Sequence, residues 1–293
     1  MNAAPDRIQI TLAGKTESFP AGTTPLEVIE RLSPALSGSV LSVMCGGDNL
    51  ALNEPLRQSC ALRPLTYHNE EGRRVYERSL RFLLLLAMRR LFPGKRIRIL
   101  NSVGYGVYLR ILDEEMDFAM VRELEAEMKK LVAGDIPFEK EIWTTEQAIE
   151  HFREFPDKAE LLSYRPSDTI PMYKLSDLYE YFYGVMVPST KYIRVFALRP
   201  HFPGLVVRMP APADPAVPAP YLPRRKHLRT FAESQEWSQI LGVSNIADVN
   251  RMIEQKKMRE FIRVNEALQD KSIAGIADQI VKNEAQIVLV FGP

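Results

Sequence analysis

Residues 75–110 decide the fold of this chain, and they read VYERSLRFLLLLAMRRLFPG (75–94) followed by KRIRILNSVGYGVYLR (95–110). The first half predicts a helix of about five turns, and its consecutive leucines, Leu83–Leu86, leave it apolar on almost every side. A helix of that kind lies deep in a core rather than on a surface. We expect it to end at Pro93 and Gly94, because proline cannot continue a helix and glycine readily follows one.

The second half of this stretch predicts two strands packed against the helix. Apolar residues recur at every second position, at Ile97, Ile99, Val107, Leu109 and Ile111. Alternation of this kind is typical of strands that bury one face. Gly104 and Gly106 lie between the two runs and predict a hairpin or a bulged pair.

Two arginines, Arg78 and Arg81, project from the helix that the leucines place in the core. An unpaired buried guanidinium would cost several kcal/mol, so at least one of these groups needs an acidic partner or a cleft. The acidic candidates are Glu77, Asp113, Glu114 and Glu180. Alternatively, Arg78 lines a pocket and holds an anion such as a nucleotide phosphate.

Composition limits the class of protein. The chain has 293 residues, 46% hydrophobic content and 21 prolines, which indicates a soluble protein with several domains. A net charge of +1 gives no general electrostatic footprint for nucleic acid. No apolar run is long enough to span a membrane, and MNAAPDRIQ lacks a signal core, so we expect a cytoplasmic protein. Cys45 and Cys60 fit a reducing compartment without a structural disulfide.

Residues 1–70 predict a small first domain. Its segments follow the order strand, strand, helix, strand, strand, with Thr24 as N-cap and Pro25 as first residue of the helix. This order is a β-grasp pattern. The phrase FPAGTTPLEVIERLSP (19–34) resembles the TGS domain that precedes the editing domain in threonyl-tRNA synthetases. The alternative is an unrelated ubiquitin-like module.

Residues 71–209 predict a second, two-layer α/β domain. The run AMRRLFPG (87–94), the strand Gly106-Val107-Tyr108 and VPST (187–190) resemble the editing domain of threonyl-tRNA synthetases. That resemblance implies a His-x-x-x-His pair on the buried helix and a Cys-x-x-x-His pair before the VPST turn. In related alanyl-type editing proteins these four residues bind zinc, which activates a water for ester hydrolysis.

Carried over residue by residue, those four positions fall on Arg78, Phe82, Phe182 and Met186. None of these side chains supplies the required zinc ligand or acid–base group, so the resemblance implies a degenerate editing site with no catalytic residue and no metal. We predict that the old pocket survives as a ligand cleft. Its candidate residues are Arg78, Arg81, Tyr105, Tyr108, Arg110, Tyr181 and Tyr183. The alternative is that the tyrosines are an ordinary aromatic core.

The remaining segments complete a predicted α+β fold. Residues 210–223 contain six prolines and predict a stiff, extended strap, with a ligand for a proline-recognition domain as the alternative. Residues 224–285 predict a helical linker with helices at 228–241, 246–264 and 274–281. The basic cluster RRKHLR (224–229) is interpreted as a solvated junction rather than an RNA patch.

Residues 286–293 predict one strand buried on both faces, because Ile287–Phe291 is continuously apolar. Gly292 and Pro293 follow, as at the start of a GxxxxGK[ST] phosphate-binding loop. Together with RSLRFLLLLA, HFPGLVVRMP and EALQDKSIAGIADQI, the layout resembles the N-terminal region of bacterial TGS-containing nucleoside kinases of the uridine kinase type. An ordinary C-terminal strand is the alternative.

This resemblance implies a parent enzyme that phosphorylates a nucleoside with ATP and Mg²⁺. The present chain would lack those cofactors and be catalytically silent. Its role would be to bind a small molecule or nucleotide, or to dock on its own downstream kinase domain. Binding of tRNA-like RNA is the competing hypothesis, and a surviving aminoacyl-tRNA ester hydrolase is a third. No membrane partner is expected.

Overall fold

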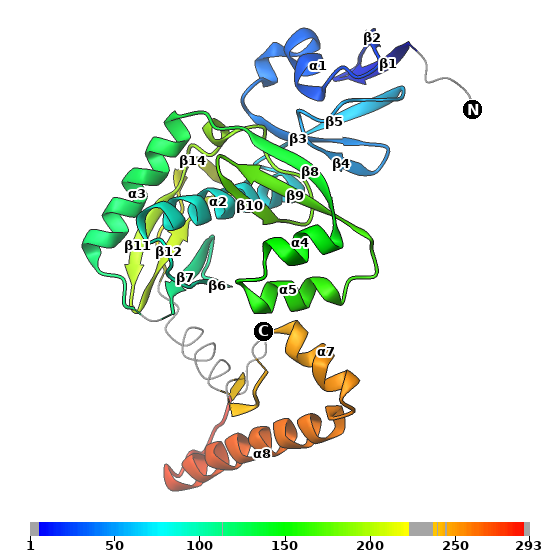
Figure 1. Cartoon of the computed structure of the whole chain (residues 1–293). Coiled ribbons are helices and arrows are strands. Elements are labelled where there is room, and N and C mark those ends of the chain that lie inside the picture. Colours follow the sequence, from blue (N-terminus) through cyan, green and yellow to red (C-terminus); the bar gives the residue numbers. More distant parts are fainter. Residues whose placement is uncertain (1–5, 113, 223–236, 239, 244, 290–293) are drawn as a thin grey trace. The chain divides into compact units, whose positions relative to one another are not determined.

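The computed structural model of the chain describes residues 6–112, 114–222, 237–238, 240–243 and 245–289 (Figure 1). The chain is α+β, as predicted. It divides into two compact units, Met1–Trp143 with Thr169–Arg224 and Thr144–Asp168 with Arg225–Pro293. The finer domain limits given above stay predictions. No helix among the described residues is both long and apolar enough to cross a lipid bilayer.

The first unit begins with a mixed five-stranded sheet in the order β2-β1-β5-β3-β4. Its strands are β1 (Arg7–Leu12), β2 (Lys15–Pro20), β3 (Val40–Cys45), β4 (Asp48–Leu50) and β5 (Cys60–Thr66). β1 and β5 run parallel, and the other pairs are antiparallel. This is the β-grasp arrangement predicted from the sequence, with the short β4 as an addition.

Helix α1 (Pro25–Leu32) packs on this sheet as the sequence predicted. Thr24 is its N-cap, and Thr24 and Glu27 form a reciprocal capping box. The buried Val28 and Ile29 join the inward residues of β1 in one core. The two cysteines, Cys45 and Cys60, are free thiols.

Helix α2 (Glu70–Leu91) is the centre of the larger core of this unit. Leu83, Leu84 and Leu86 are at most 1% exposed, and Leu85 is partly buried. The helix starts about one turn before the predicted stretch and ends just before Pro93, as predicted. Gly94 has a φ of +76°, which a glycine adopts without strain.

Two sheets surround α2, which Figure 1 shows in cyan among their strands. One has the antiparallel order β11-β12-β7-β6, and the other the order β10-β9-β8. The strands are β6 (Ile97–Ser102), β7 (Gly106–Ile111), β8 (Phe138–Thr144), β9 (Thr169–Leu175), β10 (Leu178–Tyr181), β11 (Ala197–His201) and β12 (Gly204–Arg208). The predicted bulged pair is confirmed, because the β6–β7 register shifts between Ile99 and Ser102.

Alternation along β7 fixes which residues reach α2. Val107, Leu109 and Ile111 belong to the core cluster around α2, whereas Tyr108 and Arg110 do not. Successive side chains of a strand point to opposite faces, so Tyr108 and Arg110 lie on the outer face. Helix α3 (Phe118–Ala133) adds its predicted apolar side, Val121, Leu124, Met128 and Leu131, to the same core.

The proline-rich segment folds back on itself. Pro210–Ala211 (β13) pairs antiparallel with Asp214–Pro218 (β14), so the described part is a short hairpin and not one straight strap. Arg208 Nη1 then donates a hydrogen bond to the carbonyl of Ala219 at 3.1 Å.

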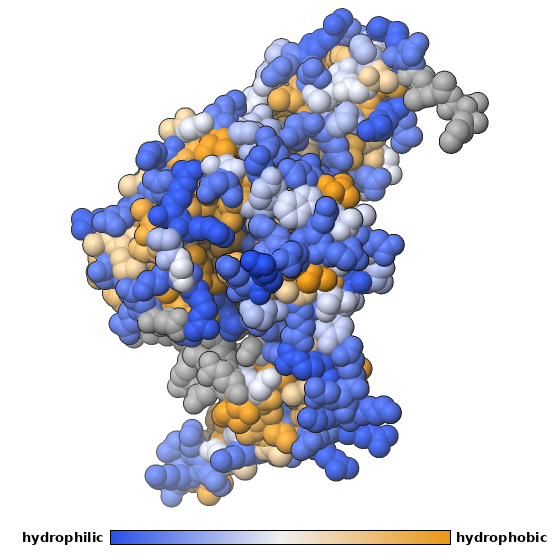
Figure 2. Space-filling view, in the orientation of Figure 1, coloured by the Kyte–Doolittle hydropathy of each residue, from blue (hydrophilic) through white to orange (hydrophobic). Residues whose placement is uncertain are grey.

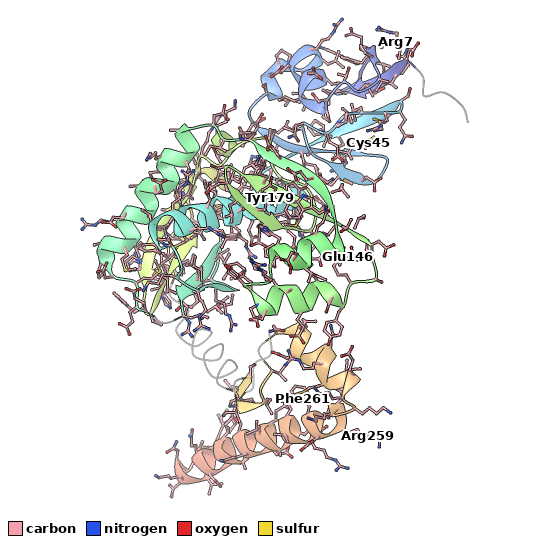
Figure 3. All side chains as sticks on the ribbon, viewed as in Figure 1. Arg7, Cys45, Glu146, Tyr179, Arg259 and Phe261 are labelled. Atoms are coloured by element: carbon pink, nitrogen blue, oxygen red, sulfur yellow. The ribbon has the colours of Figure 1, made fainter. Side chains whose placement is uncertain are left out.

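The second unit contains α4 (Thr145–His151), α5 (Pro156–Ser163), α7 (Ile246–Glu254) and α8 (Met258–Lys282). The predicted helix over 246–264 is wrong, because the chain breaks at 255–257, where Lys256 has a φ of +58°. The predicted helix over 274–281 is the end of α8. Figure 3 labels Arg259 and Phe261 near the start of α8. The predicted helix over 228–241 lies mostly outside the described residues.

The predicted buried strand at 286–291 is not formed in the described part. Residues 286–289 belong to no strand, and Ile287 and Leu289 are 80% and 73% exposed. A buried parallel strand needs hydrogen-bonded neighbours, and none of the described strands pairs with this segment. In Figure 2, the part of the surface that contains α7 and α8 shows orange, apolar side chains among blue ones. Gly292 and Pro293 lie outside the described residues.

Candidate functional site beside helix α2

The four positions carried over from the editing resemblance lie together in the structure. The rings of Phe82 and Phe182 pack with centroids 5.2 Å apart. Met186 is 1% exposed in the same core cluster, against which Phe182 also packs. Arg78 Nη1 donates a hydrogen bond to the carbonyl of Val185 at 2.5 Å. Two phenylalanine rings, a thioether and a guanidinium therefore stand at these four positions.

The segment 182–190 is held against α2 by side chains of the core. Ser79 Oγ donates to the carbonyl of Val75 at 2.8 Å and accepts from the backbone N–H of Val187 at 3.1 Å. Tyr173 donates its hydroxyl to the carbonyl of Gly184 at 2.9 Å. These bonds fix the backbone beside Arg78.

Gly184 lies directly over the guanidinium of Arg78. A Cβ added at Gly184 would stand 2.9 Å from Arg78 Cζ, closer than real Cβ atoms approach other atoms. Its φ of +95° is also a conformation that L side chains rarely adopt. Glycine is therefore required here by both the space and the backbone.

Arg78 is a half-buried cation with charges of both signs nearby. Burial lowers its pKa from the ordinary value for arginine, Tyr173 and Glu77 partly offset this, and the charges of Arg74 and Arg81 lower the pKa further. The nearby acids are engaged elsewhere, because Glu70 pairs with Arg74 at 2.6 Å and Glu77 pairs with Arg81 at 2.5 Å. No guanidinium nitrogen of Arg78 is both buried and unpartnered, so the N–H groups not bonded to Val185 are not fully buried.

Arg78 and Arg81 differ in whether they have an acidic partner, which was one of the two alternatives predicted from the sequence. Arg81 has the internal acidic partner that the first alternative required, namely Glu77. Arg78 has no carboxylate partner among the described residues and bonds only to a neutral carbonyl. The predicted partner Asp113 lies outside the described residues.

The predicted cleft is only partly assembled. Tyr181 and Tyr183 lie near this site by sequence, and their rings meet edge to face with centroids 6.1 Å apart. Tyr183 immediately precedes Gly184 and is 63% exposed. Tyr108 and Arg110, in contrast, point to the outer face of the four-stranded sheet, away from α2.

The outer-face residues have partners of their own. Tyr108 packs its ring against His201 with centroids 5.3 Å apart. Tyr105 is 53% exposed, and its carbonyl accepts a hydrogen bond from the backbone of Met209. Arg110 borders a surface hollow of about 300 Å³, lined also by Ile111, Leu112, Glu114, Glu115 and Pro203. The prediction that these residues share a cleft with Arg78 fails for Tyr108 and Arg110, because alternate residues of a strand face opposite ways.

Sequence reasoning missed the residues that shape the site, namely Ser79, Tyr173, Gly184 and Val185. The one signal present was Gly184 itself, a glycine that interrupts an aromatic and apolar run just before VPST. Among the described residues, no three His, Cys, Asp or Glu side chains are grouped so that they could hold a metal ion.

Comparison with known proteins gives one consistent relationship. No family model matches the chain. It is 35% identical over 189 residues to a threonine-tRNA ligase of Desulforamulus reducens, which covers 62% of this chain and 30% of the ligase. The ligase of Halalkalibacterium halodurans is 31% identical over 202 residues, and threonine-tRNA ligase 1 of Bacillus subtilis is 30% identical over 201 residues. About 65% of the chain is thus homologous to threonine-tRNA ligases, and the chain spans less than a third of the length of these curated relatives.

Proposed function

We propose that this chain is a non-catalytic ligand-binding or docking region, related to the editing region of threonine-tRNA ligases, that serves an ATP-dependent nucleoside kinase of the uridine kinase type. The proposal that the region is non-catalytic rests on the side chains at the four positions carried over from the editing resemblance. The tilted rings of Phe82 and Phe182 pack against each other, Met186 is buried, and Arg78 donates a hydrogen bond to a backbone carbonyl. Side chains that pack in the core thus stand where an editing site would have side chains that hold and activate a water.

Ester hydrolysis needs a group that generates a nucleophile from water, either a metal ion or a general base. Phenylalanine and methionine have no proton to exchange. Arginine stays protonated under ordinary conditions, even where burial lowers its pKa, as it does for Arg78. The surviving-hydrolase hypothesis is therefore disfavoured.

Hydrolysis is tested with purified chain and tRNA that carries the wrong amino acid. We expect no deacylation above the rate without protein, and no stoichiometric zinc by elemental analysis. A free-standing editing protein serves as positive control for the substrate. Deacylation that requires bound zinc would overturn the proposal that the site is lost.

The kinase part of the proposal is supported by sequence features. These are RSLRFLLLLA (78–87), HFPGLVVRMP (201–210), EALQDKSIAGIADQI (266–280) and the apolar run that leads into Gly292. The kinase domain would supply the phosphate-binding loop, its lysine and Mg²⁺ for transfer from ATP. Sequencing the natural gene tests this directly. We expect a Gly-Lys-Ser or Gly-Lys-Thr shortly after Pro293, and an unrelated continuation would refute the kinase context.

RNA binding is a second candidate, favoured by the outer face of the four-stranded sheet. Arg110, Arg199 and Arg208 lie on this face, and none of them forms an ion pair with a described acidic residue. Arg199 instead stacks over the ring of Tyr221 at 4.6 Å. Arginine next to aromatic rings is suited to phosphate and base contacts.

The two candidates separate by salt dependence. RNA binding through phosphates should weaken steeply between about 50 and 200 mM salt, and replacing Arg110, Arg199 and Arg208 by glutamine should greatly reduce it. A control that replaces Arg31, Arg89 and Arg153, all exposed, removes the same charge elsewhere. Equal loss in both variants would indicate non-specific attraction and would reject an RNA site on this face.

A further inference from the structure

The guanidinium of Arg78 lacks the paired carboxylate that Arg74 and Arg81 have. Arginines stand at positions 73, 74, 78 and 81 of α2, and Arg74 and Arg81 are paired with Glu70 and Glu77. Arg73 bonds to the carbonyls of Tyr67 and His68 just before the helix, whereas Arg78 bonds to the carbonyl of Val185, more than a hundred positions away in the chain. Burial lowers the pKa of Arg78.

One hydrogen bond to a carbonyl replaces only part of the hydration that the Arg78 guanidinium loses on burial. A guanidinium has five N–H donors in a planar fork, and the hydrogen bond to Val185 uses one of them. Taking a cation out of water is costly unless it is paired, and burial is the largest influence on the pKa of Arg78, which it lowers. The surrounding structure nevertheless holds the group in place, since Gly184 leaves room above it and Tyr173 anchors the Gly184 carbonyl.

The walls of the site indicate what it can accept. Phe182 supplies a partly buried apolar side, and the exposed Tyr183 stands next to Gly184. The guanidinium nitrogens of Arg78 that are not bonded to Val185 are not fully buried. The planar N–H donors of a guanidinium bind the oxygens of a phosphate or carboxylate, and the adjacent aromatic rings can contact an organic group attached to it.

We infer that Arg78 binds a small organic oxyanion at the solvent-facing edge of its guanidinium, beneath Gly184. This inference deepens the proposed ligand-binding role and rests on it, but it does not depend on the kinase context. The bound group has the chemistry of a phosphate or a carboxylate, because both oppose two oxygens to two parallel N–H donors. The group can come from a nucleotide or from an amino acid, and the experiment distinguishes these sources.

The experiment is isothermal titration of the full chain with three probes at constant ionic strength: inorganic phosphate, uridine monophosphate and threonine. We expect saturable binding of uridine monophosphate or of threonine. Binding should weaken at least about tenfold in Arg78→Met, because the loss of even one hydrogen bond to a charged group has an effect of that order. Arg89→Met is the matched control, because Arg89 is exposed on the same helix and carries the same charge.

Two further variants keep the test decisive if Arg78→Met disturbs folding. Arg78→Lys retains the charge and should bind more weakly than wild type, because it loses the two-pronged geometry. Gly184→Ala places a methyl group 2.9 Å from Arg78 Cζ and should also reduce binding. Thermal unfolding of each variant without probe reports whether the fold is intact.

The outcomes separate clearly. Binding lost with Arg78 and kept with Arg89 supports the site, and the stronger of the two organic probes names the source of the oxyanion. No binding of any probe, or equal weakening by Arg78→Met and Arg89→Met, overturns it. A gene that continues without Gly-Lys-Ser or Gly-Lys-Thr would remove the kinase context but leave a positive titration standing.

Discussion

The rings of Phe82 and Phe182 lie 5.2 Å apart at an interplanar angle of 49°, and they join α2 to the segment that precedes Gly184. Phe82 is completely buried and also packs against Phe138, with centroids 5.9 Å apart. A residue at this position is therefore part of the core and not of an open pocket. Its loss should be felt by the whole unit.

Phe82→Ala should lower the free energy of unfolding by about 3–5 kcal/mol, because it removes a buried ring and leaves a cavity. Urea denaturation followed by far-ultraviolet circular dichroism measures the change. Ile142→Ala is the control, since Ile142 is 64% exposed, and it should change stability by less than about 0.5 kcal/mol. A small effect of Phe82→Ala would mean that the ring is not packed as described.

Ser79→Ala should destabilise through an unmade hydrogen bond and not through lost volume. The hydroxyl of Ser79 is fully buried and accepts the backbone N–H of Val187. Without it that N–H is unsatisfied, which costs about 1–3 kcal/mol. Ser163→Ala, where the hydroxyl is exposed and donates to the carbonyl of Glu160, should have little effect. Hydrogen exchange of the Val187 amide, measured by NMR, should quicken in Ser79→Ala alone.

The sequence predicted the elements that depend on local patterns. The apolar helix α2, its end before Pro93, the N-cap at Thr24 and the bulged β6–β7 pair all follow from nearest-neighbour chemistry. It also indicated that residues 78, 82, 182 and 186 belong together, although only the family resemblance connected them across about a hundred residues of chain.

Features that depend on distant contacts were not predictable in the same way. Gly184 is required by a side chain more than a hundred positions earlier, which no local pattern reports. The break at Lys256 has no glycine or proline to mark it. The sequence alone argues against the prediction that Tyr108 and Arg110 lie in the cleft. The alternation that buries Val107 and Leu109 assigns the residues next to them to the other face of the strand.

Two glycines on helices should respond oppositely to alanine. A Cβ at Gly72 in α2 would stand 2.0 Å from the carbonyl oxygen of Thr66, so Gly72→Ala must push the helix away from β5. At Gly275 in α8, a Cβ would meet no atom of the other described residues within 4 Å, apart from the helix's own backbone. Gly275→Ala should stabilise α8 by about 0.5–1 kcal/mol, because alanine loses less backbone entropy than glycine. Thermal unfolding of both variants checks the pair, and a tolerated Gly72→Ala would contradict the close approach of α2 and β5.

Alkaline pH should destabilise the first unit through its buried tyrosines. Burial raises the pKa of Tyr67 and of Tyr173 to about 12, from an ordinary value of 10.0. Both hydroxyls donate hydrogen bonds to carbonyls, Tyr67 to Pro210 at 2.8 Å and Tyr173 to Gly184 at 2.9 Å. The folded state therefore keeps the protons that the unfolded chain releases.

The sign follows from proton linkage. Above pH 10 the unfolded chain binds fewer protons than the folded one, so the free energy of unfolding falls as the pH rises from 10 towards 12. Below pH 10 this contribution is complete and constant. Urea midpoints measured across that range should decline less steeply in Tyr173→Phe than in the wild type, whatever the variant's stability at neutral pH. Tyr105→Phe, whose ring is 53% exposed, is the control and should keep the wild-type slope. An unchanged slope in Tyr173→Phe would show that this hydroxyl is not held in its protonated form by the fold.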